Sequence, residues 1–210
     1  MAETDTETSS ARLTQAERRD RSERELLEAT MRVVSKHGVS AATFDVIGRE
    51  AGYSRGLVTQ RFGSKDGLIR ALIAYLHTWQ QEALGQGQLD EDDGLAELEA
   101  FIKLHCLSVG GHEESKAYYM LLSAAVADRD NTAAFADEHE VERQLIRQMI
   151  ERGQQEGRIK RDVDADATAL MIGCALIGIR MQKLIDPATG VEPIRKALME
   201  TLRARLALAK

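Results

Sequence analysis

The stretch from Thr43 to Phe62, TFDVIGREAGYSRGLVTQRF, constrains the fold of this chain more than its other segments do. Thr43 can cap a first short helix, with Asp45 in the first turn, where the helix dipole favours negative charge. Gly52 can adopt the left-handed conformation that a tight turn between crossing helices requires, and Ser54 can cap a second helix. The stretch therefore predicts two short helices that cross closely, as in a helix-turn-helix.

The second of these helices has an outward face suited to nucleic acid. Leu57, Val58 and Phe62 can point inward. The residues left facing outward are Arg55, Gly56, Thr59, Gln60 and Arg61. Arginine and glutamine suit base edges, glycine permits close approach, and hydroxyl and cationic groups suit phosphates. This face favours a helix that reads the major groove of DNA.

The flanking segments extend the pattern. Downstream, Ser64 can cap a long helix that begins near Asp66, and Lys65 at its start adds a positive charge to the free N–H groups of a helix N-terminus. Upstream, an arginine-rich segment beginning at Arg18 leads into a helix that Gly38 ends. These arginines can lie along a phosphate backbone, or can be exposed residues balanced by neighbouring glutamates.

Composition predicts the fold class. Two prolines, four phenylalanines, four tyrosines and one tryptophan, with abundant alanine, leucine, glutamate and arginine, favour helices over strands. We therefore expect an all-α protein of about nine helices, with an N-terminal three-helix helix-turn-helix head and a helical body. The expected divisions are a disordered tail (1–15), a DNA-binding head (16–65) and an effector-binding and dimerisation body (66–210).

Charge and cysteines indicate a cytoplasmic protein without a membrane span. The net charge is −6, but residues 12–65 carry +4, so the remainder carries −10. A basic head can approach DNA while an acidic body stays away from it, although ordinary helix surfaces can also vary this much. The longest uncharged apolar run, 167–179, is shorter than a membrane-spanning helix, and the N-terminus lacks the pattern of a signal peptide. Cys106 and Cys174 form no CxxC pattern and are expected to be reduced and buried.

The last two helices of the body indicate self-association. Apolar positions predict body helices over about 95–109, 115–127, 132–153 and 164–185, and a final helix after Pro193. The helix that ends at Ile185 is apolar nearly all round at its start, so it must be buried on more than one side. We expect the last two helices to form a four-helix bundle with a second copy. The alternative is that other helices of one chain cover them. The expected interface residues are Leu170, Cys174, Ile177, Met181, Ile194, Leu198 and Leu202.

Residues 20–75 resemble a known family. The order of Gly38, Thr43, the run IGREAGYSRG, Phe62 and GSKDGL is similar to the DNA-binding domain of TetR-type transcriptional regulators. The resemblance implies a homodimer whose two heads bind a palindromic DNA operator, usually as a repressor that a small-molecule effector releases.

The resemblance also implies roles for single residues. Thr43 and Lys65 would hold phosphates, Ser54 would cap the recognition helix beside the DNA, and the residues nearest the bases would be Arg55, Gly56, Leu57 and Gln60. The chain departs from the family pattern at Thr59, where a tyrosine is usual, and at Arg61, where a histidine is common. Thr59 reaches less far, whereas Arg61 keeps a cation for a phosphate.

The sequence of the body does not identify a ligand. A few polar or aromatic residues, however, lie on otherwise apolar helix faces. These candidate effector contacts are Trp79, His105, Tyr118, Tyr119, Gln148 and Arg180. Each of them can also be an ordinary core or surface residue.

Catalytic patterns are incomplete. The segments HEESK and HEVER lack the second histidine of a zinc-binding helix, and GCALIG lacks the GK[ST] of a phosphate loop. We therefore expect no enzyme activity, catalytic residue, metal ligand or cofactor. The sequence predicts a dimeric, ligand-responsive DNA-binding regulator. The alternative is a helical small-molecule-binding or adaptor protein without sequence-specific DNA binding.

Overall fold

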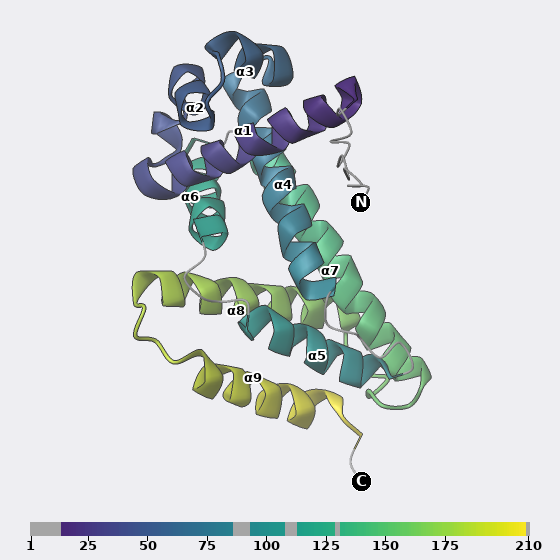
Figure 1. The fold of residues 1–210 in the computed structure, drawn as a ribbon. Helices are drawn as coiled ribbons and strands as arrows, with labels where there is room; N and C mark the ends of the chain where they lie inside the picture. The colour runs from purple at the N-terminus through teal and green to yellow at the C-terminus, as the bar shows by residue number, and fades with distance from the viewer. Residues whose placement is uncertain (1–13, 86–92, 108–112, 129–130, 209–210) are drawn as a thin grey trace, which may run out of the picture.

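The computed structural model describes residues 14–85, 93–107, 113–128 and 131–208. Within these ranges the chain forms nine α-helices and one 3-10 helix, which confirms the all-α prediction (Figure 1). The first elements are α1 (Gln15–His37), η1 (Val39–Ala41), α2 (Phe44–Ala51), α3 (Arg55–Phe62) and α4 (Lys65–Gly85). The later elements are α5 (Gly94–Leu107), α6 (Glu113–Asp128), α7 (Thr132–Gln155), α8 (Ala165–Ile185) and α9 (Val191–Leu206).

The helix boundaries follow the capping residues. The Thr43 hydroxyl accepts a hydrogen bond from the Val46 N–H at 3.4 Å, and the Ser54 hydroxyl accepts one from the Leu57 N–H at 3.2 Å. Gly52 has a φ of 76°, as the predicted turn requires. These contacts confirm the two short helices and the tight turn between them.

The first helix begins at the last residue of the range expected to be a tail. Thr14 and Glu17 form a capping box, so α1 begins at Gln15, inside the range expected to be a tail. Residues 1–13 of that range lie outside the described residues, as do residues 86–92.

The crossing of α2 and α3 depends on Gly48. A Cβ atom at this position would lie 2.8 Å from the Tyr53 carbonyl oxygen and 3.2 Å from the Arg55 nitrogen. Both atoms belong to the backbone of the turn and the start of α3, so a side chain at Gly48 must push the two helices apart.

Gly48→Ala is therefore expected to lower the free energy of unfolding by about 1–3 kcal/mol. Urea denaturation followed by circular dichroism measures this change. Gly56→Ala is the matched control, because a Cβ atom there would have its nearest neighbour at 3.7 Å. Equal stabilities of the two variants would contradict the close crossing.

The described residues form two apolar cores, and α7 contributes to both of them. The first contains residues of α1 to α4, and it continues into α6 through Ala117 and Leu121 and into α7 through Phe135. The second is formed by α5, α7, α8 and α9. The head (residues 16–65) thus packs directly on α6 as well as on α4, so both helices can transmit a movement of the body to the head.

Helix α8 is long and apolar enough to cross a membrane by length and composition alone. In the described structure it packs against α5, α7 and α9, with Ile172, Leu176 and Ile179 buried in the second core. A core helix of a soluble protein passes the same test of length and composition.

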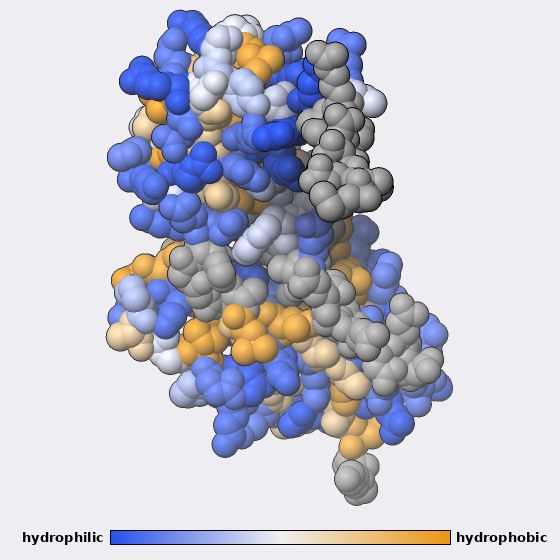
Figure 2. Space-filling model, in the orientation of Figure 1, coloured by the Kyte–Doolittle hydropathy of each residue, from blue (hydrophilic) through white to orange (hydrophobic). Residues whose placement is uncertain are grey.

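The opposite face of α8 remains uncovered within one chain. Leu170 is 52% exposed, and Cys174 is exposed too. The expectation of two buried cysteines is therefore correct for Cys106 and wrong for Cys174, because Cys174 lies on the α8 face that does not pack within the chain. Figure 2 shows a band of apolar residues across the body, in the region of α8 and α9.

Candidate DNA-binding interface and effector cavity

Helix α3 presents the predicted reading face. Arg55, Gly56, Thr59 and Gln60 are exposed, whereas Val58 is fully buried in the first core. Helices α2 and α3 lie at the end of the molecule remote from α8 and α9 (Figure 1). The face is therefore open to a large partner such as duplex DNA.

An acidic residue of α2 holds the first arginine of this face. The Arg55 guanidinium lies 3.1 Å from the Asp45 carboxylate. Both side chains are more than half exposed, and exposed ion pairs of this kind stabilise a protein by about 0–1 kcal/mol. Arg55 can therefore leave Asp45 for a base at little cost. The Thr59 hydroxyl donates to the Arg55 carbonyl at 3.1 Å.

Arg61 differs from the expectation that it faces outward. Its guanidinium donates to the Ser22 hydroxyl of α1 at 3.2 Å, and its side chain is half-buried. Leu57 is also half-buried against the first core. This confirms the inward position predicted for Leu57 from helical spacing, whereas spacing alone did not separate Arg61 from the open face.

Lys65 is exposed at the first position of α4, as predicted. Its Nζ donates to the Ser40 carbonyl oxygen of η1 at 3.2 Å. This bond connects the start of α4 with the segment that leads to Thr43. The Thr43 side chain is exposed as well. Thr43 and Lys65 therefore border the same junction at the edge of the helix-turn-helix.

A second hydrogen-bonded group braces the turn between α2 and α3. The Tyr53 hydroxyl donates to the Glu25 carboxylate of α1, and Arg21 contacts the same carboxylate at 2.8 Å. These bonds from Tyr53 and Arg21 lower the pKa of Glu25. Arg21 thus has an intramolecular partner, which favours the balanced-surface interpretation for this arginine. The supporting contacts of Tyr53 and Asp45 could not be recognised from the sequence, because their partners Glu25 and Arg55 lie in other helices.

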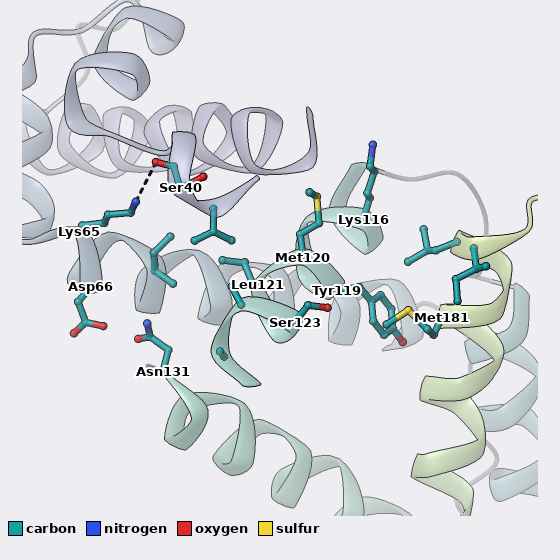
Figure 3. Close-up of a pocket in the computed structure, with 16 residues that line it drawn as sticks. Ser40, Lys65, Asp66, Lys116, Tyr119, Met120, Leu121, Ser123, Asn131 and Met181 are labelled. Atoms are coloured by element: carbon teal, nitrogen blue, oxygen red, sulfur yellow. Dashed lines mark hydrogen bonds between the residues drawn. The ribbon is translucent and has the colours of Figure 1, made fainter. Parts of the chain in front are cut away.

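A cavity of about 900 Å³ lies between the head and the body. It is bounded by η1, the start of α4, α6 and the end of α8 (Figure 3). Tyr119 is the one member of the predicted effector set among its lining residues. The size falls in the range of small-molecule sites.

Three other predicted effector residues belong to a buried polar network beside α7. The Tyr118 hydroxyl lies 2.7 Å from His139 Nε2, and His105 Nε2 lies 3.1 Å from Glu142 Oε1. Arg180 is 6% exposed and close enough to influence both Glu142 and Tyr119. These side chains interact with one another and do not line the cavity, so the assignment of Tyr118, His105 and Arg180 as effector contacts stays a prediction. The roles of His139 and Glu142 as partners of Tyr118 and His105 could not be predicted, because both residues lie in a polar stretch of α7.

Burial and charge set the protonation of this network. Burial lowers the pKa of His105, which is therefore neutral near pH 7, and burial raises the pKa of Tyr119 to about 12. Burial acts to raise the pKa of Glu142, but the contact with His105 and the positive charge of Arg180 offset it and leave the pKa lowered. A buried carboxylate opposite a buried guanidinium keeps the network balanced in charge.

The two remaining effector candidates lie elsewhere. Gln148 is exposed on α7 and does not line the cavity. Trp79 is half-buried on α4, outside the lining of the cavity. In the described part of the chain, no group of three or more His, Cys, Asp or Glu is arranged to hold a metal ion.

The lowered pKa of His105 predicts a pH dependence of stability. The unfolded chain binds a proton near pH 6.5, whereas the folded chain does so only at lower pH. The stabilisation is therefore complete above pH 6.5 and is lost as pH falls toward the lowered pKa, by at most about 1.4 kcal/mol per pH unit. Urea denaturation at a series of pH values should give His105→Gln a smaller slope below pH 6.5 than the parent chain. Identical slopes would contradict a buried, neutral His105.

The predicted dimer residues divide into two groups. Leu170, Cys174, Ile177 and Met181 follow one face of α8 and are exposed or half-buried. On α9, Ile194 and Leu198 border a shallow groove between α8 and α9. Leu202 is 2% exposed and packs in the second core, so its assignment to an interface is wrong.

Comparisons with known proteins agree with this architecture. Residues 26–72 match the family model described as bacterial regulatory proteins, tetR family. Over 81 residues the chain is 33% identical to the HTH-type transcriptional regulator BetI 2 of Chromohalobacter salexigens. That match covers 38% of this chain and 39% of the relative, so it spans well under half of either protein.

Solved structures extend the likeness to the whole fold. A TetR transcription regulator from Haloarcula marismortui is 23% identical, with a TM-score of 0.79 over 89% of this chain and 99% of that chain. A protein described as a transcriptional regulator from Saccharomonospora viridis, in complex with choline, is 19% identical, with a TM-score of 0.77 over 90% and 100%. At these identities the likeness shows the fold. Residues 26–72 thus match the tetR family model, and the chain shares its fold with solved structures of TetR-type regulators along most of its length.

Proposed function

We propose that the protein is a dimeric, ligand-responsive transcriptional regulator of the cytoplasm that binds a palindromic operator, and that it acts as a repressor. The observation that carries this proposal is the open face of α3, where Arg55, Gly56, Thr59 and Gln60 are exposed on a braced helix-turn-helix. Arginine and glutamine side chains at such a face can form paired hydrogen bonds with base edges in the major groove.

The residues in and around α3 fall into two groups, those that contact bases and those that contact phosphates. Arg55, Gly56, Leu57 and Gln60 lie nearest the bases. Four further residues, Thr43, Ser54, Thr59 and Lys65, position the head on phosphates. Arg61 braces α3 through Ser22 and reaches a phosphate only after that bond breaks. Phosphate contacts of this kind fix the register without reading sequence.

Dimerisation uses α8 and α9. The exposed apolar face of α8 and the groove beside α9 support a four-helix bundle with a second copy. A symmetric pair of heads matches a palindromic site, with the two recognition helices about 34–36 Å apart.

The effector acts through the cavity between head and body. Helix α6 forms one wall of this cavity and also packs in the first core with α1. A ligand that favours a different position of α6 would therefore shift the head and change the separation of the two recognition helices. The relative solved with choline supports ligand control in this fold.

Gel-shift titration against the DNA directly upstream of the chain's own gene tests the proposal. We expect selective binding to a duplex from this region, with affinity falling steeply as salt rises, because phosphate contacts release counterions. Absence of any selective binding, combined with ligand binding by the body, would favour the alternative of a small-molecule-binding protein that does not read DNA.

A further inference from the structure

The cavity between head and body has two chemically different ends. Lys65, Asp66 and Asn131 lie toward one end, whereas Tyr119 and Met181 lie toward the other (Figure 3). A cavity of about 900 Å³ with this division suits an elongated molecule with a polar head and an apolar chain.

The polar end offers a cation and an unused acceptor. Lys65 Nζ bonds only a neutral carbonyl oxygen, that of Ser40, among the contacts described. The Asp66 carboxylate is already bonded to Arg70. The Asn131 side-chain oxygen is buried and accepts no hydrogen bond from the described residues. An anionic group can therefore bind Lys65, and a neighbouring hydroxyl can donate to Asn131.

Asn131 has a second unusual feature. It is the described non-glycine residue with a positive φ, 61°, and it precedes α7 without capping it through its side chain. The side chain thus has no role in ending or starting the helix, and its buried oxygen lines the cavity. A buried acceptor without a donor is destabilising, and a donor group on a ligand would remove that cost.

The other end is largely apolar and adaptable, with Lys116 beside Met120 as its charged residue (Figure 3). Its lining includes Met120, Met181, Leu184 and Ile185, and methionine side chains adjust readily to an irregular chain. The Tyr119 hydroxyl donates to the Ile177 carbonyl at 3.2 Å, so this hydroxyl is already occupied within the protein. This end can bury an alkyl chain without leaving a polar group of Tyr119 without a partner.

We propose that the effector is an amphipathic monoanion, with its carboxylate on Lys65, a hydroxyl on Asn131 and its alkyl chain between α6 and α8. A cationic effector fits poorly, because Lys65 and Lys116 both line the cavity and the one carboxylate among the described lining residues, that of Asp66, is engaged by Arg70. Tyr119 is the single aromatic lining residue among those described, so the aromatic cage that binds quaternary ammonium groups is not formed.

Binding of a carboxylate to Lys65 would directly weaken the binding of DNA. This effect rests on the proposed function, in which Lys65 binds a DNA phosphate. A carboxylate makes a stronger, charge-assisted bond to the ammonium than the Ser40 carbonyl does, so the bound ligand withdraws Lys65 from the phosphate. Ligand and DNA then weaken each other's binding by the same factor.

Calorimetric titration of the full chain without DNA tests the ligand class. The probes are 3-hydroxydecanoate, decanoate, decanol and decyltrimethylammonium. We expect 3-hydroxydecanoate to bind most tightly, and decyltrimethylammonium to bind at least about tenfold more weakly than decanoate. Equal or tighter binding of the cation would overturn the proposal, as would absence of binding by both anions.

Substitutions locate the binding groups. Lys65→Met should weaken decanoate at least about tenfold and leave decanol within about twofold, which also shows that the variant is folded. Lys103→Met, an exposed lysine of α5 outside the lining, should change neither affinity. Asn131→Gly, which tolerates the positive φ, should remove the preference for 3-hydroxydecanoate over decanoate. Unchanged decanoate affinity in Lys65→Met would overturn the assignment.

Two results separate this inference from the proposed function. Anion binding that depends on Lys65, in a chain that binds no DNA selectively, supports the cavity assignment and rejects the regulator. Selective DNA binding in a chain that binds neither anion rejects the cavity assignment alone.

Discussion

Replacing Arg55 and Gln60 together by alanine is expected to remove sequence-selective DNA binding while leaving the head folded. Both side chains are exposed on α3, and Arg55 has only the exposed contact with Asp45 to lose. Each paired contact to a base edge contributes about 1–3 kcal/mol of discrimination, so the ratio of specific to non-specific affinity should fall by about 100-fold or more. Gel-shift competition with unrelated duplex measures this ratio.

The control for this prediction uses the same residue types at the far end of the molecule. Arg161 and Gln155 are exposed in the body, and their double alanine variant should keep the parent ratio. A retained ratio in the Arg55→Ala, Gln60→Ala variant would show that another surface reads the DNA.

Cys174→Glu combined with Ala197→Glu is expected to convert the dimer to monomers. Cys174 is exposed on α8, and Ala197 is exposed in the groove beside α9. In a two-fold interface the two substitutions bury four unpaired carboxylates, a cost that apolar contacts cannot offset. Sedimentation velocity should show a monomer, and operator affinity should fall by about 100-fold or more because the second head no longer binds within the same particle.

Ala136→Glu provides the matched control for dimerisation. Ala136 is exposed on α7, outside the α8 and α9 surface, and its substitution adds the same charge. It should sediment as the parent does. A dimer that persists in the Cys174→Glu, Ala197→Glu variant would place the interface elsewhere.

The helix boundaries were predictable because their causes are local. Thr43, Ser54 and Gly52 act on atoms within a few residues, so the sequence contains both partners of each contact. The open face of α3 was predictable for the same reason, since helical spacing separates Val58 from Thr59 and Gln60.

The wrong predictions concern side chains whose positions depend on contacts with segments distant in the sequence. Arg61 turns toward Ser22, 39 positions earlier, and Leu202 turns into the second core. Spacing along one helix does not show which neighbour will cover which face. Likewise, His105 and Glu142 come from different helices, so their contact could not be read from either segment.

The residues that line the cavity could not be recognised from the sequence, because their residue types are common at such positions. Lys116 is an exposed lysine, and Asn131 precedes a helix where a capping asparagine is common. Only the folded arrangement of η1, α4, α6 and α8 brings them around one space. An effector site was therefore expected in the body, but the position of this cavity next to the head was not.

Selection of binding sites from a random duplex library, with the full chain as bait, tests the central claim most directly. A dimer that reads DNA through α3 should enrich an inverted repeat whose half-sites lie about 10–10.5 base pairs apart, or a multiple of that spacing. The Arg55→Ala, Gln60→Ala variant should lose that enrichment. Recovery of no common sequence, or of one unpaired half-site that the variant recovers equally, would contradict a dimeric operator-binding regulator.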